Sequence, residues 1–266
     1  MKLIGLYYLY FISILITFSL CVVIKHPNSM KKTIDYSRSG DNWVGVCKSG
    51  VRQSPISIDR SNRVEKDILK LKYGNSKGNL VWNGSFYKID LKDTNSKVIF
   101  TDIHARPPKE HEYILKRIIF RTPPEHIVQG KVEDMEMQFF HESTDKKLTN
   151  NLLAISIPAK ITKSKKMVDD WFKNLDTDPK AFTNIEGIDK VMISLKDYFH
   201  YAGSQTVPNC VENVNWIVFK KPMLMEQRLF NTLQKNFCKR EFPKGNARHI
   251  QNNVGREIIE YSLKEE

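Results

Sequence analysis

Residues 117–143, RIIFRTPPEHIVQGKVEDMEMQFFHES, place charged side chains on two predicted β-strands that are joined by a proline-rich corner. Alternate side chains of a strand point to the same face, and this alternation directs Ile119, Arg121 and Gln138 inward. Isoleucine has no donor atom, glutamine offers only a neutral oxygen, and arginine stays protonated. An arginine and a glutamine beside an isoleucine are an unusual set of side chains for the core of a sheet.

The histidines do not form a pattern of metal ligands. His104 and His111 flank the stretch in a predicted loop, and no spacing recommends them as ligands. His126 and His141 are interpreted as buried structural histidines. The sequence therefore predicts no bound metal and no cofactor.

Four cysteines raise the question of a disulfide. Cys21 lies in the apolar N-terminal segment, and Cys238 would have no partner if the other two cysteines paired. A pair between Cys47 and Cys210 would close a long loop, as disulfides of secreted domains do. Spacing alone leaves two unrelated buried thiols as an equal alternative.

The elements that must position these residues are mostly strands. Apolar patterns predict them at 113–120, 135–141, 152–161 and 214–222. Two more strands are expected within 67–90, and helical spacing predicts a helix over 223–237.

Asn83-Gly84 is expected to form the turn between the two strands of 67–90. With Ser85 it also forms a sequon, so Asn83 is a candidate for N-glycosylation. The dipeptide is a strong turn signal in any case, and the turn needs no glycan.

The first 24 residues contain an apolar run, Leu3–Ile24, behind a single lysine. This pattern predicts a secretory signal peptide, but the run is also long enough to span a bilayer as a single membrane anchor. Residues 25–40 are interpreted as a polar linker, and one sheet-centred domain is expected over residues 41–266. The expected location is the secretory pathway, either extracellular or membrane-anchored.

The formal net charge is +12, with a sequence pI of about 9.4. A basic chain favours anionic partners such as sulfated glycans or acidic lipid headgroups. The lysines are scattered, however, and only residues 158–166 form a local basic cluster, so a solvated lysine-rich surface is the simpler interpretation. No nucleic-acid motif is present, and no nucleic-acid partner is expected.

Four segments together resemble the α-class carbonic anhydrases. They are WVGVCKSGVRQSPISI, TPPEHIVQGK, YAGSQTVPNCVENVNWIVFKKP and NARHIQNNVGREI, which occur in the family's order over about residues 41–258. The resemblance implies an α+β, β-dominated fold with a large twisted, mostly antiparallel sheet and short peripheral helices. It also implies a disulfide between Cys47 and Cys210, with Cys238 left free, buried or intermolecular.

In that family three histidines on two neighbouring strands hold Zn²⁺ and leave a fourth position for water. Zinc lowers the pKa of this water to about 7, and the resulting hydroxide attacks CO₂. The resemblance places the three ligand positions on Ile119, Arg121 and Gln138. Since two unit charges 4 Å apart interact by about 4 kcal/mol at a dielectric of 20, an arginine there would repel Zn²⁺ by roughly 8 kcal/mol.

Other family positions are retained or lost. Glu125 and Thr206 match the carboxylate and threonine that orient the zinc-bound hydroxide, and Glu136 matches a carboxylate that orients the third histidine. Ser85 falls on the proton-shuttle histidine, and Phe140 falls on a small residue of the CO₂ pocket.

A buried guanidinium without a partner is costly. Because both carboxylates persist, we expect Arg121 to pair with Glu125 or with Glu136 and to replace the charge of the metal. The alternative is an opportunistic arginine in a relaxed cavity.

The favoured function is a non-catalytic carbonic-anhydrase-like domain that serves binding or assembly in the secretory or extracellular space. Its partner would be an unknown protein or an acidic glycan. One alternative is a structural subunit of a membrane-anchored complex, with Leu3–Ile24 retained. The other is an enzyme, either an active carbonate dehydratase with a relocated metal or an esterase built on Thr206.

Overall fold

The computed structural model describes residues 33–66, 68–163, 183–185, 188, 192, 195–234, 242, 244–253 and 255–262. The predicted signal peptide or anchor, residues 25–32 of the expected linker, and Cys238 lie outside these ranges. Neither helix within them is long and apolar enough to cross a bilayer.

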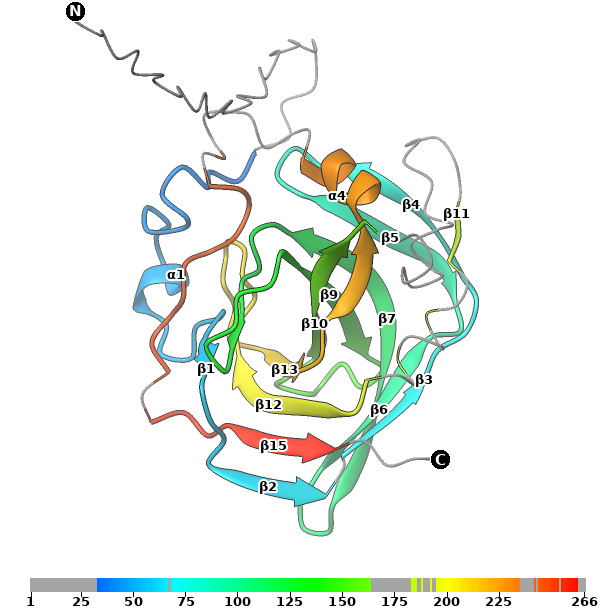
Figure 1. Cartoon of the computed structure of the whole chain (residues 1–266). Helices are drawn as coiled ribbons and strands as arrows, with labels where there is room; N and C mark the ends of the chain where they lie inside the picture. Colours follow the sequence, from blue (N-terminus) through cyan, green and yellow to red (C-terminus); the bar gives the residue numbers. More distant parts are fainter. Residues whose placement is uncertain are drawn as a thin grey trace, which may run out of the picture.

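Strands dominate the described part of the chain, with two short helices at the periphery (Figure 1). The N-terminal half contains α1 (Val46–Ser49), β1 (Ser57–Ile58), β2 (Arg63–Lys66), β3 (Leu69–Lys72), β4 (Ser76–Trp82), β5 (Tyr87–Thr94), β6 (Lys97–Asp102), β7 (Lys109–Arg121), β8 (Ile127–Val128) and β9 (Met135–Ser143). The C-terminal half contains β10 (Leu152–Thr162), β11 (Thr183–Ile185), β12 (Asp197–Gly203), β13 (Val214–Phe219), β14 (Met223–Glu226), α4 (Gln227–Gln234) and β15 (Ile259–Ser262).

Thirteen of the described strands form one sheet, in the order β11-β4-β5-β7-β9-β10-β13-β12-β15-β2, with β3, β6 and β14 paired beside this path. Most neighbours are antiparallel, whereas β10 pairs in parallel with β13 and β14, and β15 pairs in parallel with β2. The predicted β-dominated, mostly antiparallel fold with short peripheral helices is confirmed. β1 and β8 form a separate parallel pair.

The centre of the sheet is covered on both faces. On one face Ile118, Phe120, Met137 and Phe139 belong to the main hydrophobic core. A smaller cluster around Trp216 covers part of the other face. All six residues of β13 are buried. Burial on both faces of the sheet accounts for the mostly apolar sequence of this strand.

Two predicted element types are corrected by the structure. The region 67–90 was expected to hold two strands, but it contains β3, β4 and the start of β5. β4 was not predicted, because Gly78 weakens the alternating pattern expected of a strand. The close approach of the neighbouring strand explains this glycine, since a Cβ at position 78 would lie 2.6 Å from Ile89 Cγ2. The expected helix over 223–237 begins only at Gln227, because Met223–Glu226 pair with β10 instead.

A turn is present at Asn83-Gly84, but it joins β5 to the unexpected strand β4 rather than to β3. Asn83 Oδ1 accepts hydrogen bonds from the backbone N–H groups of Ser85 and Phe86, both at 2.9 Å. Gly84 has a φ of +100°, which favours glycine.

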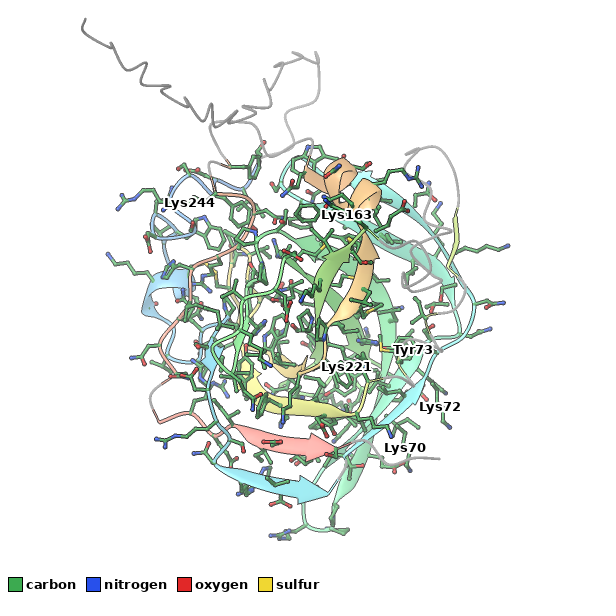
Figure 2. The ribbon with its side chains drawn as sticks, viewed as in Figure 1. Lys70, Lys72, Tyr73, Lys163, Lys221 and Lys244 are labelled. Carbon is green, nitrogen blue, oxygen red and sulfur yellow. A yellow bond between two sulfur atoms is a disulfide. The ribbon has the colours of Figure 1, made fainter. Side chains whose placement is uncertain are left out.

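Lysine side chains are spread over the surface. Figure 2 shows Lys244 and Lys70 on opposite sides of the molecule, with Lys163 and Lys221 between them in this view.

Candidate functional site

The site is built by the antiparallel pair β7 and β9. Their register sets Ile119 opposite Gln138 and Arg121 opposite Glu136. Ile119, Arg121 and Gln138 are all buried, as the alternation predicted. Arg121 Nε donates to Gln138 Oε1 at 3.2 Å, whereas the Ile119 side chain has no polar atom to contribute.

Arg121 is fully enclosed, and each of its three nitrogens makes a hydrogen bond. Besides the Nε bond to Gln138, Nη1 donates to the Tyr36 hydroxyl at 2.9 Å and to the Asn246 carbonyl at 3.2 Å. Nη2 donates to Thr206 Oγ1 at 3.2 Å. The Phe86 ring covers the guanidinium, with its centroid 4.8 Å from Cζ. A planar donor group with this many partners is held in one orientation.

Glu125 is the carboxylate that pairs with Arg121. Glu125 Oε2 lies 3.4 Å from Arg121 Nε, and neither side chain is exposed. The same oxygen accepts a 2.6 Å hydrogen bond from Gln138 Nε2, and Oε1 accepts the backbone N–H of Arg248 at 3.0 Å. Burial alone would lower the pKa of Arg121, but Glu125 and Tyr36 outweigh it and raise this pKa above its ordinary value.

Glu136 belongs to a second, adjoining network. Its Oε2 accepts the backbone N–H groups of Glu125 and His126. Its Oε1 accepts hydrogen bonds from Gln138 and Ser156 and lies 2.9 Å from His126 Nδ1. Burial alone would raise the pKa of Glu136, but His126 and these hydrogen bonds lower it to about 2. Glu136 is therefore held ionised beside the buried Arg121–Glu125 pair.

Two partners of Arg121 come from regions that sequence patterns did not connect with the site. Tyr36 lies within the expected 25–40 linker, yet it is completely buried and packs against Trp43 and Phe242. Asn246 lies in the NARHI segment and binds the end of β7. Its Oδ1 accepts the backbone N–H of Thr122, and its Nδ2 donates to the Phe120 carbonyl. A lone aromatic in a polar stretch was the only signal for Tyr36, because its contacts are long-range.

Thr206, Ser85 and Phe140, which the resemblance singled out, make structural contacts. Thr206 is buried and reaches Glu125 only through Arg121, which bonds to both. Ser85 is buried, and its Oγ accepts the backbone N–H of Ile34 at 2.8 Å. Phe140 is half-buried and contacts Trp216 with ring centroids 5.8 Å apart.

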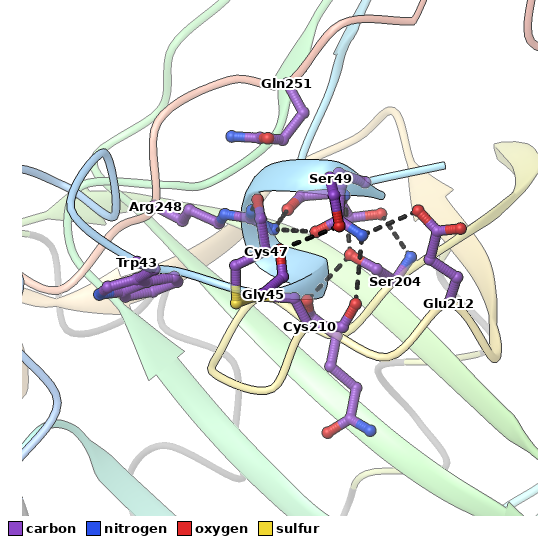
Figure 3. The surroundings of a disulfide bond; sticks show 12 residues. Trp43, Gly45, Cys47, Ser49, Ser204, Cys210, Glu212, Arg248 and Gln251 are labelled. Atoms are coloured by element: carbon purple, nitrogen blue, oxygen red, sulfur yellow. Dashed lines mark hydrogen bonds between the residues drawn. A yellow bond between two sulfur atoms is a disulfide. The ribbon is translucent and has the colours of Figure 1, made fainter. Parts of the chain in front are cut away.

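The predicted disulfide between Cys47 and Cys210 is confirmed, and it joins positions 163 residues apart in the sequence. Figure 3 shows Cys47 on α1 and Cys210 on the loop beside it. Arg248 reaches the same corner, where Nη2 donates to the Cys47 carbonyl at 2.6 Å. Because its own N–H bonds to Glu125, Arg248 connects the disulfide corner to the buried network.

Of the described histidines, His126 contacts the network through Glu136. His104 and His111 line a separate cleft that also contains His200. His141 is buried, with Nε2 2.7 Å from the Tyr73 hydroxyl. Within the part of the chain that the structure describes, no three His, Cys, Asp or Glu side chains are grouped so as to hold a metal ion.

Comparisons with known proteins agree with this architecture. The family model described as eukaryotic-type carbonic anhydrase matches residues 38–262. Dioscorin dioA3 of Dioscorea japonica is 29% identical over 203 residues, which span 71% of this chain and 70% of that protein. Carbonic anhydrase Nec1 of Nesocodon mauritianus is 28% identical over 227 residues, spanning 80% and 76%. A crystal structure of dioscorin complexed with ascorbate superimposes with a TM-score of 0.66 at 26% identity and covers 83% of this chain and 90% of the dioscorin chain.

Proposed function

Because the chain belongs to the eukaryotic-type carbonic anhydrase family, we propose that it is a member in which a buried ion-pair network replaces the zinc centre. In this proposal the domain serves binding or assembly rather than CO₂ hydration. Its partner is a protein or an acidic glycan.

The residues at the three proposed ligand positions do not fit a zinc ion. Zinc in proteins takes Cys, His and carboxylate ligands in a tetrahedral arrangement. Ile119 offers no donor atom, and Arg121 has no lone pair to share. The Gln138 amide is already committed, since its oxygen accepts from Arg121 and its nitrogen donates to Glu125 and Glu136.

The observation that carries the proposal is the complete burial and bonding of Arg121. A buried charge is tolerated only where a counter-charge and hydrogen bonds compensate for lost hydration. Glu125 supplies the counter-charge at 3.4 Å, and the fold supplies an acceptor for each nitrogen. These contacts support a structural cation at this corner and argue against an opportunistic arginine.

The relatives allow for both catalytic and other roles. Nec1 is named a carbonic anhydrase, whereas the dioscorin crystal structure is a complex with ascorbate. The fold is therefore compatible with a binding role, and the chemistry of Arg121 favours that role for this chain.

The proposed location is the secretory pathway or the extracellular space. The disulfide between Cys47 and Cys210 supports it, because such bonds persist in oxidising compartments. Residues 1–24 would act as a cleaved signal peptide or as a membrane anchor, and N-terminal sequencing of the mature protein distinguishes the two. An intact Met1 end would favour the membrane-anchored alternative.

The test is to measure bound zinc and CO₂ hydration after incubation with zinc and dialysis. The matched control is the triple variant Ile119→His, Arg121→His and Gln138→His, which places three imidazoles on the neighbouring strands β7 and β9. We expect no stoichiometric zinc in the wild-type protein and about one zinc per chain in the variant.

Stoichiometric zinc together with hydration well above the uncatalysed rate in the wild-type protein would refute the proposal. This decision depends only on the wild-type protein, so it stands even where the triple variant does not fold.

A further inference from the structure

A cleft of about 390 Å³ opens above the buried network, within the range of roughly 300–1,000 Å³ that is typical of small-molecule sites. Ile119, Arg121 and Phe140 are among the residues that line it. Since Arg121 is fully bonded inside the protein, recognition in this cleft depends on the side chains above it.

A β-bulge concentrates positive charge on one side of this cleft. Regular alternation would direct Lys116 and Arg117 to opposite faces of β7. The β7–β9 register shifts between Leu115 and Arg117, and both basic side chains line the cleft. A bulge of this kind re-aims a side chain. Lys146, from the segment after β9, joins them.

Two of these cations are available to a ligand. Lys116 and Lys146 are exposed, and among the described residues neither ammonium group has a hydrogen-bond or ion-pair partner. Arg117 is less available, because its Nε lies 3.5 Å from Asp90 Oδ1. An anionic group that enters the cleft would meet both free ammonium groups.

The other lining groups indicate that this ligand also carries hydroxyls. The half-buried Gln205 side chain lines the cleft and has no hydrogen-bond partner among the described residues. The exposed Glu142 carboxylate also lines the cleft. It accepts hydrogen bonds from hydroxyls but repels a bare anion such as sulfate. Phe140 adds an aromatic surface against which a sugar ring can pack.

We propose that this cleft binds an acidic saccharide, with the carboxylate or sulfate at Lys116 and Lys146, the hydroxyls at Gln205 and Glu142, and the ring against Phe140. The assignment rests on the proposed non-catalytic function and names the ligand class of the same site.

The experiment measures binding of a size-defined chondroitin sulfate tetrasaccharide to the full chain by calorimetry. Inorganic sulfate and a neutral N-acetylglucosamine tetrasaccharide serve as comparison ligands. Lys116→Glu/Lys146→Glu tests the cleft. Lys221→Glu/Lys244→Glu makes the same change of charge at exposed lysines outside it, and Figure 2 shows both positions. Thermal unfolding of each variant confirms that it is folded.

We expect the acidic tetrasaccharide to bind more tightly than either comparison ligand. The cleft variant should lose at least about tenfold in affinity and some of the salt dependence, since it removes two charged contacts. The control variant should change affinity by less than about twofold, because neither lysine lines the cleft and exposed charges are screened by salt. Gln205→Ala should weaken binding while leaving the salt dependence unchanged.

Equal losses in the two double variants would overturn the proposal, because they would indicate diffuse attraction to a basic surface. Sulfate binding as tightly as the tetrasaccharide would also overturn it. Competition by free glucuronate would support it and identify a single sugar unit as sufficient. Zinc content is measured separately, so failure of saccharide binding is distinguishable from failure of the metal-free proposal.

Discussion

Replacing Arg121 with methionine isolates the energetic role of the buried cation. Methionine keeps much of the length of the side chain but removes the charge and all guanidinium hydrogen bonds. The buried Glu125 carboxylate would then lose the counter-charge that now lies 3.4 Å away. Tyr36, Thr206 and the Asn246 carbonyl would also lose a donor.

Removing one partner of a buried ion pair typically costs about 3–5 kcal/mol of stability. For a domain of this size each kcal/mol lowers the melting temperature by roughly 2–4 °C, so Arg121→Met should lower it by about 6–20 °C. Arg117→Met is the matched control on the same strand. Arg117 also faces a carboxylate, with Nε 3.5 Å from Asp90 Oδ1, but its side chain is 47% exposed. Such a pair contributes about 0–1 kcal/mol.

The assay is urea unfolding of the wild-type protein, of the single variants Arg121→Met, Glu125→Gln and Arg117→Met, and of the double variant Arg121→Met/Glu125→Gln. The double variant also removes the Glu125 carboxylate that Arg121→Met leaves without a counter-charge. Its loss of stability should therefore be smaller than the sum of the losses of Arg121→Met and Glu125→Gln by about 0.5–3 kcal/mol. Two results would refute the reasoning. One is an Arg121→Met loss within about 1 kcal/mol of the Arg117→Met loss, and the other is strict additivity in the double variant.

Two other predictions concern titration and glycosylation. Burial lowers the pKa of His141 from 6.5 to about 4, so its contribution to stability is complete above pH 6.5 and is lost toward pH 4. His141→Gln should remove about 1.4 kcal/mol per pH unit from the slope of unfolding free energy in that window, and an unchanged slope would contradict the assignment. Asn83 uses Oδ1 in its turn, and among the described residues its Nδ2 has no partner. Protein from a eukaryotic secretory host should therefore lose mass on treatment with peptide N-glycosidase, and Asn83→Gln should abolish that loss; an unglycosylated wild-type protein would exclude the modification.

Much of the site could be predicted because its central part is local. β7, the proline-rich corner and β9 follow one another in sequence, so alternation directs Ile119, Arg121 and Gln138 inward, while the resemblance to a family grouped them as one site and the register sets Ile119 opposite Gln138. The disulfide pairing came from the resemblance to a family, since spacing left it open. Elements whose identity depends on neighbouring strands were less predictable, as β14 shows: hydrogen bonding to β10 outweighed its helical spacing.

The sequence by itself determined the chemical character of the site: an arginine and two glutamates at an inward corner of a sheet. It left undecided whether Glu125 or Glu136 pairs with Arg121. Tertiary structure made that choice, because His126, Ser156 and two backbone N–H groups saturate Glu136, while Glu125 Oε2 faces Arg121. Tertiary structure also supplied the partners Tyr36 and Asn246, which lie 85 and 125 residues from Arg121 in the chain. Local patterns contain no information about contacts at such separations, whereas burial requires each polar group of the guanidinium to find a partner.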